Sequence, residues 1–262
     1  MAQQLTVLVT GGSSGIGRAT AICFAQKGWR VFEMSRREVP AEGVIHLTGD
    51  VTSLADCQRV VASVLEQAGQ LDVLICNAGM GISGSVEFAP DDLMHKQLEV
   101  NFFGAVHIIQ SVLPHMRSRR QGRILVVSSM AALFGIPFQS FYSASKSALC
   151  SMTLALRNEV APWNISVGCL LPGDVKTGFT AARVKHPEGE EVYARLDKAV
   201  SSMEHDEQTG QSAERLARRL YDLATCRRLS AYNYEGMNYR FFALLYKLLP
   251  TSCLNWIVGK MY

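Results

Sequence analysis

The sequence predicts a single α/β domain, residues 1–262, in which helices cover both faces of a parallel sheet. Short apolar runs rich in β-branched residues alternate with segments of helical periodicity, which is the pattern of right-handed βαβ crossovers. The chain is also 48% hydrophobic over 262 residues, which is enough to bury one large core. No internal repeat, low-complexity segment or linker marks a second domain.

The predicted elements follow one another along most of the chain. Six buried strands are expected at 5–10, 30–34, 44–47, 71–76, 123–128 and 165–170. Helices are expected at 15–28, 53–68, 91–119, 139–161 and 211–227. Residues 174–212 are polar and irregular, so we interpret them as an insertion that serves as a substrate lid. Residues 239–262 form an apolar and aromatic tail.

Charge and composition exclude several classes of function. The net charge is +3 and the basic residues are dispersed, so nothing indicates a nucleic-acid partner. The 7 cysteines include no C-x-x-C pair and the 6 histidines lack ligand spacing, so no metal site is predicted. The apolar run 5–9 is too short for a signal sequence. Because most cysteines also lie in apolar runs, we expect a cytoplasmic protein.

A glycine-rich turn, Thr10-Gly-Gly-Ser-Ser-Gly-Ile-Gly17, joins the first predicted strand to the first helix. Its spaced glycines permit a tight turn, close approach of a pyrophosphate and close packing of the helix on the sheet. Free N–H groups at the helix N-terminus would attract phosphate. The alternative is an ordinary flexible loop. The predicted cofactor contacts in this turn are Gly11, Ser13, Ser14, Gly15, Ile16 and Gly17.

The end of the second predicted strand indicates which dinucleotide binds. An acidic residue about twenty positions beyond the turn would bind the ribose 2′-hydroxyl of NAD. This chain has Ser35-Arg36-Arg37 at that place. Guanidinium groups suit a 2′-phosphate by charge and geometry. NADP(H) is therefore the predicted cofactor, and NAD(H) is the alternative. The alternative would hold if both arginines are only solvated loop charges, which is the simpler interpretation for Arg37.

Tyr142 and Lys146 form the most informative pair in the sequence. Four positions apart on a predicted helix, they share one face, and a cation beside a phenol lowers the pKa of the phenol toward neutrality. Ser129 precedes Tyr142 by thirteen residues and could hold a substrate oxygen beside it. Ser128 competes for that role, but the spacing favours Ser129. Such a Tyr–Lys pair also arises by chance, so its meaning depends on the other motifs.

In their order and spacing, the motifs resemble those of the classical short-chain dehydrogenase/reductase family over about residues 5–178. They are the turn at 10–17, Asp50-Val51, Cys76-Asn77-Ala-Gly79, Asn101, Ser129, Tyr142-x-x-x-Lys146, Pro172-Gly173 and Thr177. The resemblance implies a single-domain, Rossmann-type doubly wound sheet, an NAD(P)-dependent oxidoreductase of alcohols and carbonyls, and a homodimer or homotetramer. The apolar pocket and tail are most similar to the hydroxysteroid, retinol and acyl-dihydroxyacetone-phosphate reductase branches.

The resemblance also implies a role for each matched position. Tyr142 would exchange a proton with the substrate oxygen. Lys146 would lower the Tyr142 pKa and hold the nicotinamide ribose, and Ser129 would polarise the substrate. Asn101 would hold a water that links Lys146 to solvent, unless it is only a polar group inside a helix. The remaining expected cofactor contacts are Asp50, Val51, Asn77, Ala78, Gly79, Pro172, Gly173, Val175 and Thr177, although Pro172-Gly173 is first a strand terminator.

A lipophilic ketone or alcohol is the predicted substrate. The expected pocket walls are 80–85, the 174–212 insertion, the tail and an apolar stretch, unless that stretch only fills the core. Its members are Met130, Leu133, Phe134, Ile136 and Phe138. The tail could pack on the domain or a partner subunit, cover the pocket, or make peripheral contact with a membrane. The alternatives to an oxidoreductase are a non-catalytic NADPH sensor and an isomerase or dehydratase on the same scaffold.

Overall fold

A seven-stranded parallel sheet forms the centre of the protein. The computed structural model describes residues 4–262, and the strand order is β11-β7-β6-β4-β1-β2-β3. Every neighbouring pair is parallel. The strands are β1 (Thr6–Thr10), β2 (Arg30–Ser35), β3 (Val44–Thr48), β4 (Val73–Cys76), β6 (Gly122–Val127), β7 (Ile165–Leu171) and β11 (Tyr232–Tyr234). The predicted α/β class and all six predicted strands are confirmed.

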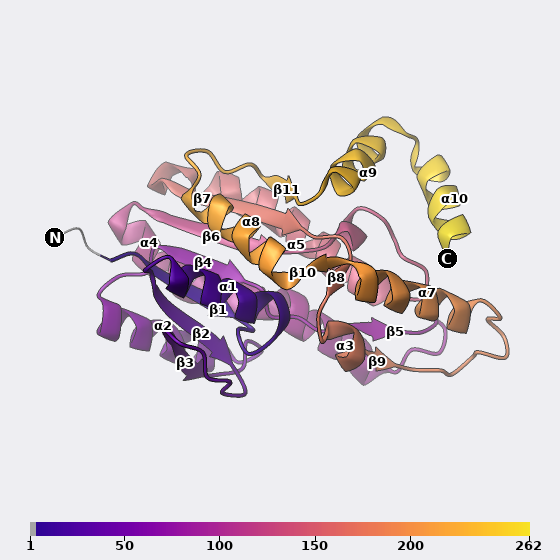
Figure 1. The fold of residues 1–262 in the computed structure, drawn as a ribbon, viewed down its shortest axis with the longest axis horizontal. Helices are drawn as coiled ribbons and strands as arrows, with labels where there is room; N and C mark the ends of the chain where they lie inside the picture. The colour runs from indigo at the N-terminus through magenta and orange to yellow at the C-terminus, as the bar shows by residue number, and fades with distance from the viewer. Residues whose placement is uncertain (1–3) are drawn as a thin grey trace.

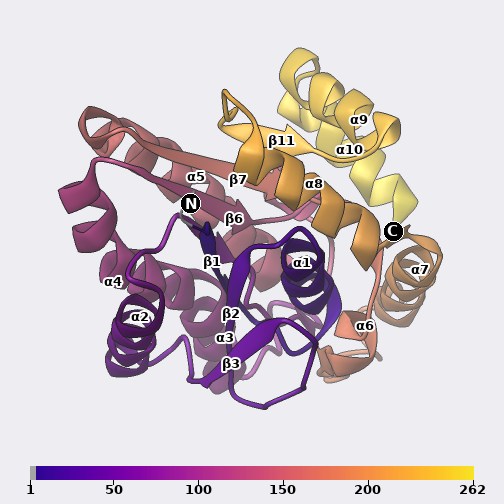
Figure 2. The same cartoon turned by 60° about the vertical axis from the view of Figure 1, so that its left-hand side comes forward.

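Helices cover both faces of the sheet (Figures 1 and 2). On one face lie α1 (Gly15–Gln26) and α8 (Ala213–Thr225); on the other lie α2 (Leu54–Ala68), α4 (Gly104–Arg119) and α5 (Ser140–Glu159). The alternation of side chains along a strand produces this arrangement. In β1, Val7 and Val9 pack toward α1 and α8, whereas Leu8 packs toward α2 and α4.

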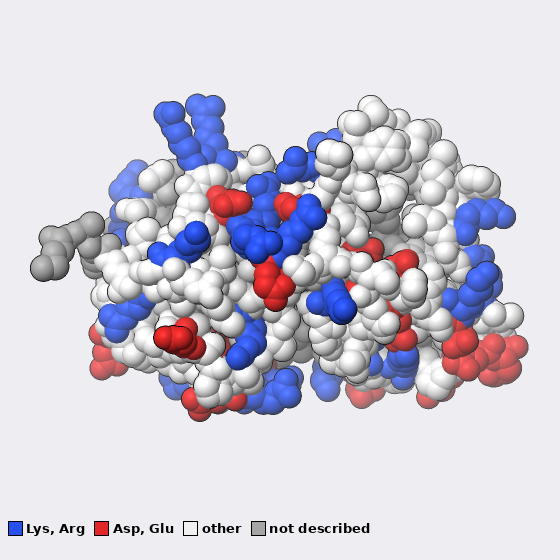
Figure 3. Space-filling view, in the orientation of Figure 1, with Lys and Arg blue, Asp and Glu red and all other residues white. Residues whose placement is uncertain are grey.

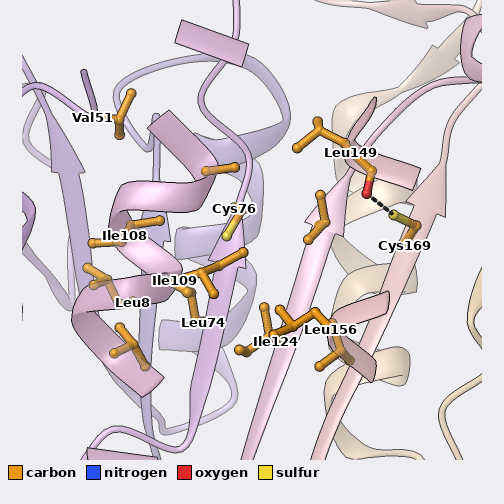
Figure 4. Packing of buried hydrophobic residues seen from close by; sticks show 14 of the residues in the cluster. Leu8, Val51, Leu74, Cys76, Ile108, Ile109, Ile124, Leu149, Leu156 and Cys169 are labelled. Atoms are coloured by element: carbon orange, nitrogen blue, oxygen red, sulfur yellow. Dashed lines mark hydrogen bonds between the residues drawn. The ribbon is translucent and has the colours of Figure 1, made fainter. Parts of the chain in front are cut away.

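The largest of three apolar clusters among the described residues fills the space between the sheet and α2, α4 and α5. Figure 4 shows Leu8, Leu74, Ile108 and Ile109 in contact across this layer. Cys169 of β7 faces α5, and its thiol donates to the Leu149 carbonyl at 4.0 Å. Burial of apolar area at about 25 cal/mol per Å² makes this layer the main source of stability. This packing also fixes the position of α5 relative to the sheet, and α5 carries Tyr142 and Lys146.

The predicted helix 91–119 consists of three segments. Helix α3 (Asp91–Leu98) and α4 are joined by a π-helical turn, η1 (Glu99–Phe103), which contains Asn101. A π turn inserts one extra residue and is often found at functional sites. The periodicity of the sequence predicted the helical span but not this turn.

The prediction that 174–212 is irregular is wrong over much of its length. The segment contains α6 (Phe179–Ala182) and α7 (Leu196–Thr209), and its ends form short strands. Leu196, Val200 and Met203 recur at helical spacing in α7 and pack in a small cluster with Ile136 and Phe138. The polar residues of α7 concealed this narrow apolar stripe. The short strands are β8 (Val175–Lys176), β9 (Val184–Lys185) and β10 (Gln211–Ser212), with β5 (Ile82–Ser83) as the partner of β9.

The chain ends in two helices that the sequence analysis treated as one apolar tail. Helix α9 (Met237–Leu248) follows the unpredicted strand β11, and α10 (Thr251–Met261) begins after Pro250. Figures 1 and 2 show both helices beyond the β11 edge of the sheet. Within residues 4–262, the protein has no helix of the length and hydropathy needed to span a bilayer.

Candidate active site

The carboxyl ends of the parallel strands open into one cavity of about 810 Å³. The glycine-rich turn follows β1, Ser129 follows β6 and Pro172 follows β7, so the topology brings distant motifs to one edge of the sheet. Nearly all predicted site residues line this cavity. They are Gly11, Ser13, Ser14, Gly15, Ile16, Ser35, Arg36, Arg37, Asp50, Val51, Asn77, Ala78, Gly79, Ser129, Tyr142, Lys146, Pro172, Gly173, Val175 and Thr177.

Gly17 does not line the cavity but lies directly behind the turn. A Cβ at this position would lie 2.3 Å from the Gly11 carbonyl oxygen and 2.4 Å from Asn77 Nδ2. Asn77 itself donates to the carbonyls of Thr10 (3.0 Å) and Gly11 (3.3 Å). The side-chain amide of Asn77 therefore holds the turn in place. Glycine is required at position 17 because α1 passes so close to the turn that a Cβ would clash.

The same turn fits a pyrophosphate. Gly11 and Gly15 adopt left-handed backbone angles, with φ of 70° and 52°. Within residues 4–262, Ser14 makes no side-chain capping bond to α1. The first N–H groups of α1 therefore remain available to an anion, as the helix dipole favours.

At the other side of the turn, the residues after β2 and β3 form a basic rim. Arg36 is 73% exposed at its side chain and lies 3.9 Å from the Asp50 carboxylate. Ser35 donates its hydroxyl to the Arg37 carbonyl at 2.9 Å and shapes the bend. The Arg36 guanidinium lines the cavity, and Asp50 is its only ion-pair partner within 4.0 Å in residues 4–262.

Tyr142, Lys146 and Ser129 meet at the middle of the cavity. The Lys146 ammonium lies 5.7 Å from the centroid of the Tyr142 ring and donates to the Val127 carbonyl at 3.0 Å. Ser129 lines the cavity beside Tyr142, its Oγ accepts from the Ala131 N–H at 3.1 Å, and its side chain lowers the pKa of Tyr142. Ser128 instead donates to the Lys146 carbonyl at 2.9 Å and is buried. The geometry thus favours Ser129 over Ser128 as the hydroxyl that meets a substrate.

Burial, rather than Lys146, controls the pKa of Tyr142 in the protein. Desolvation raises the pKa of Tyr142 to about 12, although the hydrogen bond from Ser129 opposes this. Desolvation also lowers the pKa of Lys146 to about 8. The expectation that Lys146 brings the Tyr142 pKa toward neutrality is therefore wrong for the protein alone. Both side chains lie in a low-dielectric site, where removing water outweighs their mutual interaction.

Asn101 is fully buried and does not line the cavity, as judged over residues 4–262. Its Oδ1 accepts from the Met80 N–H (2.8 Å), and its amide donates to the Met80 carbonyl and to Ser145 Oγ (both 3.0 Å). Ser145 in turn donates to the Tyr142 carbonyl at 2.7 Å. Asn101 therefore ties the loop after β4 to the turn of α5 that carries Tyr142, and the predicted water relay stays a prediction.

Sequence analysis missed a group of polar residues beside Tyr142. Asp174 and Glu207 raise the Tyr142 pKa and Arg183 lowers it. Arg183 is buried and paired with Glu207, which also accepts from Thr180 at 2.6 Å. These residues fall in the insertion that was treated as irregular, so no periodic signal pointed to them.

Tyr239 of α9 is a further residue of the site that the sequence did not indicate. A Cβ at Gly173 would lie 1.8 Å from the Tyr239 ring, so the ring packs flat on that glycine. The Tyr239 hydroxyl accepts from the Asp174 N–H (2.9 Å) and donates to the Asp174 carboxylate (3.0 Å). The C-terminal helix thereby holds the segment that follows β7 on the floor of the cavity.

We expect Tyr239→Phe to lower kcat about three- to tenfold, because two hydrogen bonds that orient Asp174 are lost while the ring stays. Unfolding free energy should fall by about 1 kcal/mol. Steady-state kinetics with NADPH and thermal denaturation measure the two effects. Tyr246→Phe on the same helix serves as the matched control. Unchanged kinetics in Tyr239→Phe would show that the hydrogen bonds between Tyr239 and Asp174 have no influence on the site.

Comparison with known proteins identifies the family. Residues 5–188 match the family model described as short chain dehydrogenase. The chain belongs to this family. The short-chain dehydrogenase is 42% identical over 182 residues to 3-ketodihydrosphingosine reductase of Bacteroides thetaiotaomicron, a match that covers 69% of this chain and 68% of that one. It is 32% identical to mouse dehydrogenase/reductase SDR family member 7B, covering 82% and 69%.

Solved structures agree with this assignment. A short-chain dehydrogenase from Streptomyces avermitilis superposes with a TM-score of 0.83 at 26% identity, covering 93% of this chain and 92% of that one. The short-chain dehydrogenase described here is accordingly an oxidoreductase of CH–OH groups with a Rossmann-type fold. Solved structures of the same fold include ElxO with NADP bound and a serine dehydrogenase complexed with NADP⁺.

Proposed function

We propose that this short-chain dehydrogenase interconverts a lipophilic ketone or aldehyde and its alcohol with NADP(H), and that Tyr142 acts as the general acid/base. One observation carries the proposal: a single cavity joins the glycine-rich turn, the Tyr142 hydroxyl and the apolar faces of α9 and α10. A dinucleotide at the turn and a substrate under the helices would therefore meet at Tyr142.

The chemistry assigned to the protein's own groups follows from their positions. When bound, the nicotinamide supplies or accepts a hydride at the reacting carbon. In reduction, the Tyr142 hydroxyl gives its proton to the carbonyl oxygen, so that C=O becomes CH–OH. Ser129 donates to the same oxygen and orients it. A Tyr142 pKa of about 12 keeps the proton on this hydroxyl at neutral pH, which suits reduction.

Apolar walls support a lipophilic substrate. On the α9 and α10 side, the lining side chains are Phe242, Leu245, Leu254, Ile257, Val258 and Met261. Of the predicted apolar stretch, Met130, Phe134 and Ile136 line the cavity. Leu133 and Phe138 instead pack in apolar clusters, so their prediction as wall residues is wrong. The relative from Bacteroides thetaiotaomicron is a 3-ketodihydrosphingosine reductase, and a substrate of that kind would suit such a pocket.

The proposal is tested by monitoring NADPH absorbance with a panel of carbonyl compounds that includes long-chain keto lipids. We expect NADPH consumption with at least one apolar ketone, and the reverse reaction with its alcohol. Tight NADPH binding without turnover across the panel would favour a sensor. Product formation without net NADPH consumption would favour an isomerase or dehydratase.

Arg36→Ala is expected to weaken NADPH binding about tenfold while leaving NADH binding within about twofold, because an exposed guanidinium contributes one charge-assisted contact to a 2′-phosphate. Fluorescence titration with each nucleotide measures this difference. Arg37→Ala is the comparison variant and should have the smaller effect. Equal affinity of the wild type for NADH and NADPH would contradict the proposed preference.

We also propose a cytoplasmic location and a homodimer or homotetramer that pairs through α4 and α5. All cysteines within residues 4–262 are free thiols, which agrees with a reducing compartment. Phe103 and Leu154 leave apolar side chains exposed near this face. Cell fractionation and sedimentation velocity test the two statements.

A further inference from the structure

Helix α9 has two apolar faces. Tyr239, Phe242 and Leu245 line the cavity. Met237, Phe241, Leu244 and Leu248 recur at spacings of four, three and four, so they form one stripe on the outside of the helix. They are 85%, 57%, 50% and 69% exposed. Covering the cavity requires only the inner face of α9, so the exposed apolar stripe on its outer face needs another explanation.

Helix α10 also has an inner and an outer side. Its inner face, Leu254, Ile257, Val258 and Met261, lines the cavity. On its outer side, Trp256 is 64% exposed. Arg195, Lys198 and Lys260 border a shallow hollow of about 400 Å³ beside Trp256. A tryptophan next to cations is a common arrangement at the interface between membrane and water.

The charges of the C-terminal helices have one sign. Residues 236–262 contain Arg240, Lys247 and Lys260 but no aspartate or glutamate. All three cations are exposed. In Figure 3, uncharged atoms cover the region of α9 at the upper right, basic side chains lie on the right-hand edge directly below it, and acidic side chains follow further down.

We propose that the outer faces of α9 and α10 dock the protein on the surface of a bilayer that contains anionic phospholipid. The stripe and Trp256 would enter the interface, and the basic side chains would meet lipid phosphates. The inner faces of the same helices line the catalytic cavity, so docking would place the cavity wall next to the source of a lipophilic substrate.

A second copy of the chain fits this surface less well. In a two-fold dimer the same patch lies on both subunits. Exposed cations would then face cations, because residues 236–262 offer no carboxylate to pair with them. An anionic lipid surface supplies the missing negative charge.

The test is co-sedimentation of the full chain with phosphatidylcholine vesicles, with and without about one-third phosphatidylglycerol. We expect binding to the anionic vesicles, weaker binding to the neutral ones, and release at high salt. The double variant Phe241→Glu/Leu248→Glu should reduce partitioning about tenfold or more. Neither side chain lines the cavity, so NADPH binding should be unchanged.

Leu54→Glu is the matched control, because Leu54 is an exposed leucine of α2, a helix that lies apart from α9 and α10 in Figures 1 and 2. It should bind vesicles like the wild type. The proposal is overturned if the wild type does not bind anionic vesicles, or if the double variant binds as well as the wild type. It is also overturned if sedimentation shows a dimer that the double variant dissociates. Because vesicle binding is read without turnover, a failed docking test leaves the proposed activity standing, and the reverse holds equally.

Discussion

Replacing Tyr142 with phenylalanine is expected to lower kcat for carbonyl reduction about 10²–10⁴-fold, the range that a positioned general acid contributes. The variant keeps the ring that packs against Phe179 at 5.8 Å and removes only the hydroxyl. That hydroxyl is the group we assign as the proton donor, and it shares the cavity with Ser129. Loss of rate should therefore occur with little loss of stability. Single-turnover kinetics with NADPH and the best substrate of the carbonyl panel measure the chemical step.

The control for this experiment is Tyr221→Phe. Tyr221 lies on α8 and packs against Phe24 at 5.2 Å, away from the cavity. The Tyr221→Phe variant should reduce substrate at the wild-type rate. NADPH affinity should stay within about twofold in both variants, since the tyrosine hydroxyl contributes at most one neutral hydrogen bond to the nucleotide. Normal turnover in Tyr142→Phe would remove Tyr142 from the mechanism.

Gly17→Ala should weaken NADPH binding about tenfold or more and destabilise the protein by about 1–2 kcal/mol. Alanine favours a helix by about 1 kcal/mol over glycine. The added methyl would lie 2.3 Å from the Gly11 carbonyl oxygen, which is backbone and moves only with the turn. Overpacking of this kind costs about 1–3 kcal/mol. The steric cost outweighs the gain in propensity, and its effect falls on the phosphate-binding loop.

Gly135→Ala provides the comparison, because a methyl there meets no described atom within 4 Å. Nucleotide titration and urea denaturation of both variants measure the two effects. Gly135→Ala should match the wild type within about 0.5 kcal/mol. Normal NADPH binding by Gly17→Ala would contradict the prediction. It would mean that the turn can move away from the added methyl despite its hydrogen bonds from Asn77.

Much of the architecture could be predicted from local pattern. The six apolar runs became six strands because buried parallel strands need little more than β-branched, uninterrupted apolar sequence. The strand β11 was missed because Tyr-Asn-Tyr carries no such pattern, and its place depends on pairing with β7. Helix α7 was missed because its apolar stripe is narrow. The stripe is buried only through its tertiary contacts with Ile136 and Phe138.

Ser129, Tyr142, Lys146 and the glycine-rich turn could be singled out from residue type and spacing once the motifs were taken together in their order along the chain. The pKa values of Tyr142 and Lys146 could not be predicted, since burial is decided by residues from distant parts of the chain. The same holds for the clamp of Tyr239 on Gly173, which joins residues 65 or more positions apart through Asp174. Composition sufficed to predict an apolar tail at 239–262, but not its two helices. Only the folded chain decided that one face closes the cavity while the other meets solvent, because that division depends on where the sheet edge lies.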